Sequence, residues 1–345
     1  LTESPAQPLR RHLQPSPPPP PKPPEPMRAS LKPSVPHPPK PVHKATKPAE
    51  PARPLAAPSG LISEDEAKMR PAPEWQVLRV DRATSDALLD GDRPLPPDTR
   101  LSMLWRPTWS AAGEVIGVYR AYIQRHDADN ETPLEGTQAY SDSGATAQAL
   151  DRFGIAATMR AFRAAEADGH GAVLVLPIHW ATLHAQLRME LLAPMADVTA
   201  ASRKARLVVE LFGIPGRVTS DEVAESIQTL RPLCREVVLR SQLGAVNGLA
   251  AARSGASMVG VDLADLGPSE RIDDDHLLAR LLEFRTQAAQ AGMGSFVWGA
   301  RRRKVVMGTV TGGFSMVNGP ALMKDIARPA KVVPAPRARF AATTV

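Results

Sequence analysis

The second half of the chain alternates short, continuous apolar runs with segments of helical spacing. The apolar runs are rich in β-branched residues and lie at 172–176, 207–212, 236–239, 257–262 and 295–298. Such runs, separated by helices, indicate parallel strands joined by helical crossovers, with both faces of the sheet covered. The sequence therefore predicts an α/β fold. About six parallel strands suit either a closed barrel or an open doubly wound sheet, and periodicity alone does not separate the two.

A hairpin-like pair precedes these units. Two apolar runs, within 104–109 and 114–125, flank a turn that contains Gly113. This pattern predicts a β-hairpin at the entry to the folded region. The polar stretch 127–143 is expected to be a connecting loop, and the apolar spacing over 146–167 predicts a long amphipathic helix.

The first 72 residues have the composition of a disordered arm. Of the 36 prolines in the 345-residue chain, about 20 lie in the first 60 residues, and the excess of basic residues there accounts for the net charge of +6. Such a segment buries too little apolar surface to fold and favours polyproline II. We expect a spacer or a docking ligand for a proline-binding partner. We expect a lead-in segment at 73–97, a folded domain at 98–325 and a disordered basic tail at 326–345.

The number of cysteines and the hydropathy of the sequence indicate the cellular compartment in which the chain is expected. Cys234 is the single cysteine, so no intrachain disulfide forms, which agrees with a cytoplasmic location. No apolar run approaches the roughly 18 residues of a membrane span, and no signal peptide is visible. The basic arm has no aromatic residues to stack on bases, so no DNA partner is expected. Because the chain opens with Leu1, we expect it to continue upstream.

Residues 98–325 resemble the EAL domain, the family of bacterial cyclic di-GMP phosphodiesterases. In that family the second strand of the opening pair reads Gly-x-Glu-Ala-Leu-x-Arg. Here the naming tripeptide falls at Arg120-Ala121-Tyr122, or one residue earlier, and neither register supplies the glutamate. Gln124 or Ile123 stands where the arginine would be. The resemblance implies a TIM-like (β/α) barrel whose first metal ligand is missing.

The later landmarks of the family follow in order but with altered site residues. Pro177 stands where an asparagine ligand is expected, and Glu210 keeps the first acid of a Glu-x-x-Glu pattern. The positions that we identify as vestiges of the family's site are Arg120, Pro177, Glu210, Arg240, Gly260, Asp262 and Trp298. The resemblance thus implies a degenerate site in which Glu210 and Asp262 are the remaining acids.

These losses matter because two-metal phosphodiester cleavage requires several oxygen ligands that hold two cations close together. Two carboxylates beside arginines favour ion pairs over metal binding, so we expect no catalytic residue and no cofactor. Mg²⁺ or Mn²⁺ would enter only if this interpretation is wrong. The arginines Arg106, Arg120, Arg125 and Arg240 either contact ligand phosphates or pair with Glu210, Asp262 or Glu114, and we favour the ion pairs.

Three functional hypotheses follow. The first is a non-catalytic EAL-like scaffold that acts through unidentified protein partners in bacterial signalling, with a homodimer left open. The alternative is a cyclic di-GMP receptor without hydrolysis, and the third is an active phosphodiesterase. His179 and His184 lack metal-ligand spacing and are interpreted as core or rim residues. The basic run 301–304 is interpreted as a solvated face or a partner contact.

Overall fold

The computed structural model describes most of the chain after residue 97. The described residues are 74, 76–77, 95–96, 98–140, 144–244, 254–267 and 273–341. The expected disordered arm, most of the lead-in segment and the helix expected at 245–253 lie outside them.

Eight of the described strands close into a barrel, so the closed alternative is confirmed. Strand β2 pairs antiparallel with β3 on one side and with β10 on the other, and the remaining neighbours in the barrel are parallel. The barrel strands are β2 (Arg100–Ser110), β3 (Val115–His126), β5 (Val173–His179), β6 (Leu207–Phe212), β7 (Glu236–Arg240), β8 (Met258–Asp262), β9 (Gly294–Trp298) and β10 (Met316–Asn318).

The predicted hairpin is confirmed and is longer than its apolar runs indicated. Its two strands pair from Arg100↔His126 to Ser110↔Val115, with a register shift between Thr108 and Trp109. The turn uses positive φ angles at Gly113 (93°) and Glu114 (50°). Short strands border the hairpin, because β1 (Gln76–Val77) pairs with β2 and β4 (Leu134–Glu135) pairs with β3.

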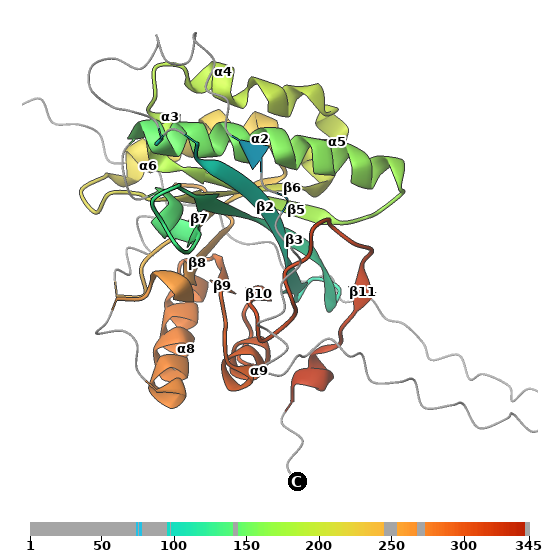
Figure 1. Cartoon of the computed structure of the whole chain (residues 1–345). Coiled ribbons are helices and arrows are strands. Elements are labelled where there is room, and N and C mark those ends of the chain that lie inside the picture. The colour runs from blue at the N-terminus through green and yellow to red at the C-terminus, as the bar shows by residue number, and fades with distance from the viewer. Residues whose placement is uncertain are drawn as a thin grey trace, which may run out of the picture. The chain divides into compact units, whose positions relative to one another are not determined.

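Helices cover the outside of the barrel, as Figure 1 shows for α2 and for α8 and α9. Their bounds are α2 (Gly144–Ala167), α3 (Trp180–Leu183), α4 (Arg188–Leu192), α5 (Ala200–Arg206), α6 (Ser220–Leu230), α8 (Asp274–Gln290) and α9 (Arg303–Thr311). Two short helices, α3 and α4, follow β5. A capping box of Thr219 and Glu222 starts α6.

The strand alternation separates apolar residues that face the helices from those that face the barrel interior. Outward residues such as Leu174, Leu176 and Ile178 join the large core between the barrel and its helices. The inward residues form a smaller core inside the barrel, made of Val118, Val175, Val208, Val238, Phe296, Trp298 and Met316. At the carboxyl ends of the parallel strands, polar side chains lie next to this inner core, which reaches that end of the barrel at Trp298.

We expected a disordered tail at 326–345. This expectation is wrong for the tail residues that the structure describes, because they contact the barrel. Ile326 forms a β-bridge with Trp105, and β11 (Val333–Pro334) pairs with the start of β3. The indole of Trp109 donates to the carbonyl of Ala335 at 2.8 Å, and Phe340 packs edge-on against Trp109. Composition was misleading here because one buried aromatic ring and a few backbone hydrogen bonds suffice to hold a Pro- and Arg-rich segment.

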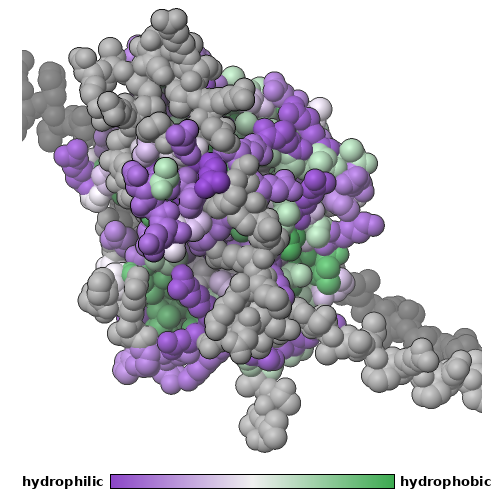
Figure 2. Space-filling model, in the orientation of Figure 1, coloured by the Kyte–Doolittle hydropathy of each residue, from purple (hydrophilic) through white to green (hydrophobic). Residues whose placement is uncertain are grey.

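On the face that Figure 2 presents, hydrophilic residues cover most of the described surface and apolar residues form small separate areas. Among the described helices, none combines the length and the apolar character that crossing a membrane requires.

Candidate functional site

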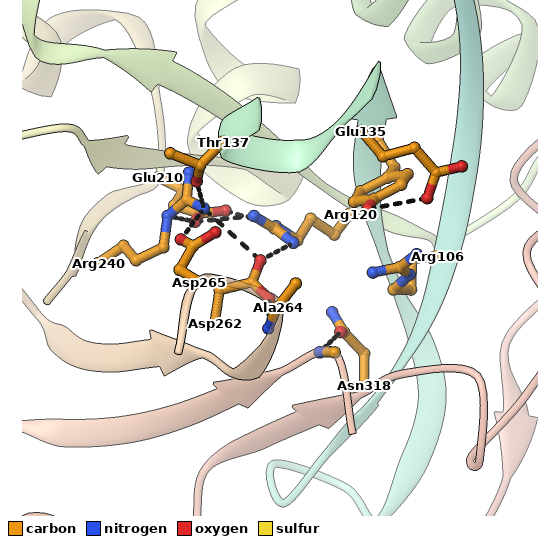
Figure 3. A network of polar contacts seen from close by, with 12 residues as sticks. Arg106, Arg120, Glu135, Thr137, Glu210, Arg240, Asp262, Ala264, Asp265 and Asn318 are labelled. Atoms are coloured by element: carbon orange, nitrogen blue, oxygen red, sulfur yellow. Dashed lines mark hydrogen bonds and ion pairs between the residues drawn. The ribbon is translucent and has the colours of Figure 1, made fainter. Parts of the chain in front are cut away.

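Polar side chains form the layer above the inner core, at the carboxyl ends of the parallel strands. Because residues two apart on a strand share a face, Arg120 follows Val118 into the barrel, Glu210 follows Val208 and Arg240 follows Val238. Figure 3 shows these side chains converging from β3, β6 and β7, with Asp262 and Asp265 beside them. We call Arg120, Arg240, Glu210, Asp262 and Asp265 the mouth cluster.

Arg120 is the centre of the mouth cluster. Its Nε and Nη2 donate to the two carboxylate oxygens of Glu210 at 2.6 and 3.1 Å, and its Nη1 donates to Asp262 at 2.9 Å. All three side chains are almost fully buried, with at most 2% of each exposed. A guanidinium group has the planar fork that such a bidentate contact requires. Arg120 therefore forms ion pairs with both Glu210 and Asp262, the two acids that the sequence keeps at these positions.

Arg240 completes the neutralisation from β7. Its Nε lies 3.0 Å from Glu210, and its Nη1 lies 2.9 Å from Asp265 and 3.6 Å from Asp262. The same Nη1 donates to the hydroxyl of Thr137 at 3.1 Å. The guanidinium also stacks 4.0 Å from the centroid of the Phe212 ring. The predicted ion pairs of Arg120 and Arg240 are thus present.

Arg106 lies next to Arg120 in the hairpin register but binds a different acid. Its Nε and Nη2 donate to Asp325 at 2.9 and 3.0 Å, and its guanidinium lies 3.8 Å over the ring of Tyr122. Asp325 lies 219 residues away in the sequence, so spacing gave no sign of this partner. The expected partners Glu210, Asp262 and Glu114 are wrong for Arg106.

Arg125 lies outside the mouth cluster. Its side chain points away from Arg120 because the two positions are five residues apart on one strand. It pairs with Asp127 at 2.8 Å and donates to the carbonyl of Ala139 at 3.1 Å. The structure therefore does not bring Arg125 together with the other three arginines.

Aromatic rings fill the side of the barrel where Gly260 and Trp298 lie. The rings of Phe296 and Trp298 stack with centroids 4.4 Å apart, and Trp298 lies 5.5 Å from the Arg120 guanidinium. A Cβ at position 260 would lie 2.2 Å from the Phe296 ring, so only glycine fits there. Pro177, paired with Glu210 in the β5–β6 register, contributes no polar side chain.

Burial and the neighbouring arginines have opposite effects on the pKa values of the carboxyl groups in the mouth cluster. Burial alone would raise the pKa of Asp262, but Arg120, Arg240 and Arg106 hold the pKa of that carboxyl below its ordinary value. For Asp265, burial outweighs the attraction of Arg240 and raises the pKa. Burial would lower the pKa of Arg120, yet Glu210 and Asp262 raise it, so its guanidinium stays charged.

The mouth cluster does not fit a two-metal site. Hard divalent cations need several free oxygen ligands, and here both oxygens of Glu210 and one of Asp262 are held by guanidinium groups. The other oxygen of Asp262 accepts from the backbone N–H of Ala264 at 3.1 Å. Across the described residues, no group of three or more His, Cys, Asp or Glu side chains is placed to hold a metal ion.

A second buried polar cluster lies beside the mouth, and sequence inspection missed it. Asp151 on α2 accepts from the Tyr140 hydroxyl at 3.0 Å and from the backbone N–H of His179 at 2.8 Å. Burial raises the pKa of Asp151 to about 7 and lowers that of His179 to about 4, to which Arg240 also contributes. The His179 ring stacks on Tyr140 and caps α3, so it serves the fold as interpreted.

Two remaining candidates also have structural roles. Cys234 is buried and burial raises the pKa of its thiol to about 11, which agrees with the interpretation that it is not a nucleophile. In the basic run, Arg302 and Lys304 pair with Asp274 and Asp275 at the start of α8.

A cavity of about 490 Å³ opens next to the mouth cluster. Arg240, Asp265, Ser241 and Gln242 give it a polar side, and apolar residues of β6, β7, β8, α6 and α8 contribute to the rest of its lining. It is large enough for part of a small ligand.

No family model matches the sequence, and no curated protein matches it. Solved structures do match the fold. The PaMucR phosphodiesterase in complex with cyclic di-GMP superimposes with a TM-score of 0.53 at 11% identity, over 66% of this chain and 92% of that chain. The Bacillus subtilis YkuI protein, with an EAL domain, in complex with cyclic di-GMP and calcium, superimposes with a TM-score of 0.52 at 14% identity.

The YkuI match covers 70% of this chain and 58% of that chain, so it spans little more than half of YkuI. At these identities the comparisons concern the fold. The described domain of this chain is a TIM-like barrel of the EAL-domain type.

Proposed function

We propose that this chain is a degenerate member of the EAL family and acts as a non-catalytic binding or scaffold module. One observation carries the proposal: Arg120, which one register of the family motif aligns with the first glutamate, donates from all three of its guanidinium nitrogens to Glu210 and Asp262. A metal ion that activates a water molecule would need the carboxylate oxygens of Glu210 and Asp262, which Arg120 and Arg240 already bind. The module would therefore work through binding, with protein partners in bacterial signalling.

The remaining parts of the chain fit a tethered module. The proline-rich arm before residue 73 is long enough to link the barrel to a partner or to another domain. Its composition suits a spacer or a proline-recognition ligand and lacks aromatic residues for base stacking. The single cysteine favours the reducing cytoplasm.

The alternative function is a receptor that binds cyclic di-GMP without cleaving it. The cavity beside Arg240 supports it, because a guanidinium at the edge of a cavity can bind a phosphate. The solved structures with cyclic di-GMP bound share the fold. Against it, Arg106, Arg120 and Arg240 are each 8% exposed or less and already paired with acids.

Calorimetric titration of the full chain with cyclic di-GMP separates the two. The scaffold function predicts no heat of binding. The receptor function predicts saturable binding that the Arg240→Gln variant loses, while Arg303→Ala, which removes an exposed arginine at the start of α9, leaves it unchanged. A thermal melt of each variant shows whether it is folded. Saturable binding by the wild-type chain would overturn the scaffold function.

A further inference from the structure

Four members of the mouth cluster, all but the exposed Asp265, are buried although they lie where a parallel barrel opens to solvent. Glu210 is 0% exposed, Arg120 2% and Asp262 3%. In TIM barrels the carboxyl ends of the strands form the open face that carries binding sites. Burial this complete requires a cover, and part of the cover is the chain segment between β3 and α2.

Residues 134–140, which we call the lid segment, bind the mouth through two side chains. Glu135 accepts from the Gln124 amide at 2.6 Å and from the Tyr122 hydroxyl at 3.4 Å. Thr137 accepts from Arg240 at 3.1 Å. In Figure 3 the ribbon that carries Thr137 and Glu135 lies over the mouth cluster, and Thr137 points to Arg240.

The two ends of the lid segment are fixed differently from its middle. At the start, β4 pairs with β3. At the end, Arg125 donates to the carbonyl of Ala139 and the Tyr140 hydroxyl donates to buried Asp151. Between these anchors lies Gly136, with φ of 56° and the Tyr122 hydroxyl 3.5 Å from where a Cβ would stand. The segment from Gly136 to Tyr140 is thus a short 3-10 helix, and Glu135 and Thr137 bind its start to the barrel.

The outer face of the lid segment is open to solvent, because Gln138 is exposed. Thr137 is also exposed, although its hydroxyl accepts from Arg240. Its inner contacts use Tyr122 and Gln124, two positions of the hairpin strand that follow Arg120 on the inward face. Two polar side chains of the barrel interior therefore bind the lid segment of the same chain.

From these contacts we propose that the lid segment is an intramolecular cover that occupies the barrel mouth. From the cavity beside Arg240, a ligand or partner reaches the buried Arg120, Glu210 and Asp262 by displacing Glu135 and Thr137. The inference concerns the same site as the proposed function but does not depend on the absence of catalysis. A chain without a cover could still lack turnover, and a covered chain could show turnover once the cover is displaced.

Hydrogen exchange of the full chain, followed by mass spectrometry, tests the cover. In the Glu135→Ala/Thr137→Ala variant we expect amides of 134–140 and of the carboxyl ends of β6 and β7 to exchange at least about tenfold faster. The control variant Glu131→Ala/Thr132→Ala changes two exposed residues of the same connection and should match the wild type.

Unchanged protection of the ends of β6 and β7 in the double-alanine variant would overturn the proposal, since the lid segment would then cover nothing. If that variant does not fold, Thr137→Val keeps the side-chain volume and removes the acceptor for Arg240. Faster exchange confined to 134–140 in that variant, with the strand ends unchanged, also counts against a cover. Loss of protection at both places supports it. None of these outcomes depends on cyclic di-GMP turnover, which tests the proposed function separately.

Discussion

The guanidinium of Arg120 donates two hydrogen bonds, 2.6 and 3.1 Å long, to the carboxylate of Glu210 inside a closed barrel. The two residues lie 90 positions apart in the sequence, on β3 and β6. Both are buried, so neither charge is compensated by water. The ion pair keeps Arg120 and Glu210 charged inside the barrel. Its contribution to the stability of the fold can be measured by replacing Arg120.

Replacing Arg120 with Met should destabilise the fold by about 3–5 kcal/mol, because Glu210 and Asp262 lose a buried counter-charge. Arg120→Lys should recover part of the loss, since a lysine keeps the charge but not the bidentate fork. Denaturant unfolding monitored by circular dichroism measures the change. The control Arg303→Met removes an exposed arginine and should shift stability by less than about 0.5 kcal/mol. Equal effects of Arg120→Met and the control would refute the buried ion pair.

The Arg120→Glu variant replaces the central arginine of the mouth cluster with a carboxylate. It places a third carboxylate beside Glu210 and Asp262, and the variant should melt at a lower temperature than the wild type. Free oxygen ligands then become available, so millimolar Mn²⁺ should raise the melting temperature of the variant by mass action. The wild-type chain should show no Mn²⁺-dependent shift. A shift of the wild type comparable to that of the variant would mean that Arg120 does not exclude the metal.

The cluster of Asp151 and His179 predicts two opposite dependences of stability on pH. Burial raises the pKa of Asp151 from 3.8 to about 7, so the folded chain keeps a proton that the unfolded chain releases. This contribution to the free energy of unfolding is fully present below about pH 4 and is lost as the pH rises to about 7. Relative to Asp151→Asn, the wild type should therefore lose stability over this range, by about 1.4 kcal/mol per pH unit at most.

His179 has the opposite sign. Burial lowers its pKa from 6.5 to about 4, so its contribution is present above about pH 6.5 and is lost as the pH falls toward 4. Relative to His179→Asn, which keeps a side chain able to cap α3, the wild type should gain stability as the pH rises from 4 to 6.5. Denaturant unfolding at several pH values gives both differences. Two differences of the same sign would show that one of the two groups is not perturbed as the burial indicates.

The ordered tail gives a separate prediction. Phe340 is 3% exposed and packs on Trp109, so Phe340→Ala should cost about 3–5 kcal/mol. The neighbouring exposed residue Arg339 serves as the control, and Arg339→Ala should change stability little. Thermal melts of the two variants compare them directly. If both variants melt like the wild type, the tail does not contribute to the barrel.

Much of the barrel could be predicted from sequence because its signals are local. The hairpin, the parallel strands and helix α2 follow from apolar spacing and from turn residues such as Gly113. Alternation along each strand also places Arg120, Glu210 and Arg240 on the inward face. Their ion pairs could be anticipated because the family resemblance puts all three residues at the carboxyl ends of barrel strands, around one mouth.

The rest depended on contacts between distant segments. Asp325 reaches Arg106 from beyond the last barrel strand, and no spacing rule connects them. Thr137 and Glu135 lie in a stretch that is polar and turn-rich, and such composition does not show that it folds back over the mouth. Asp151 lies on the apolar face of α2, where it becomes visible only once Tyr140 and the start of α3 are placed beside it.

We propose that arginines occupy the place of the metal in the barrel mouth, so that the chain does not cleave cyclic di-GMP. The most direct measurement is chromatographic detection of linear product after the full chain is incubated with cyclic di-GMP and Mg²⁺ or Mn²⁺. The Arg120→Met variant, which removes the central arginine, serves as a comparison. We predict no product above the metal-only blank for the wild type. Metal-dependent product that scales with the concentration of the wild-type chain would contradict the claim.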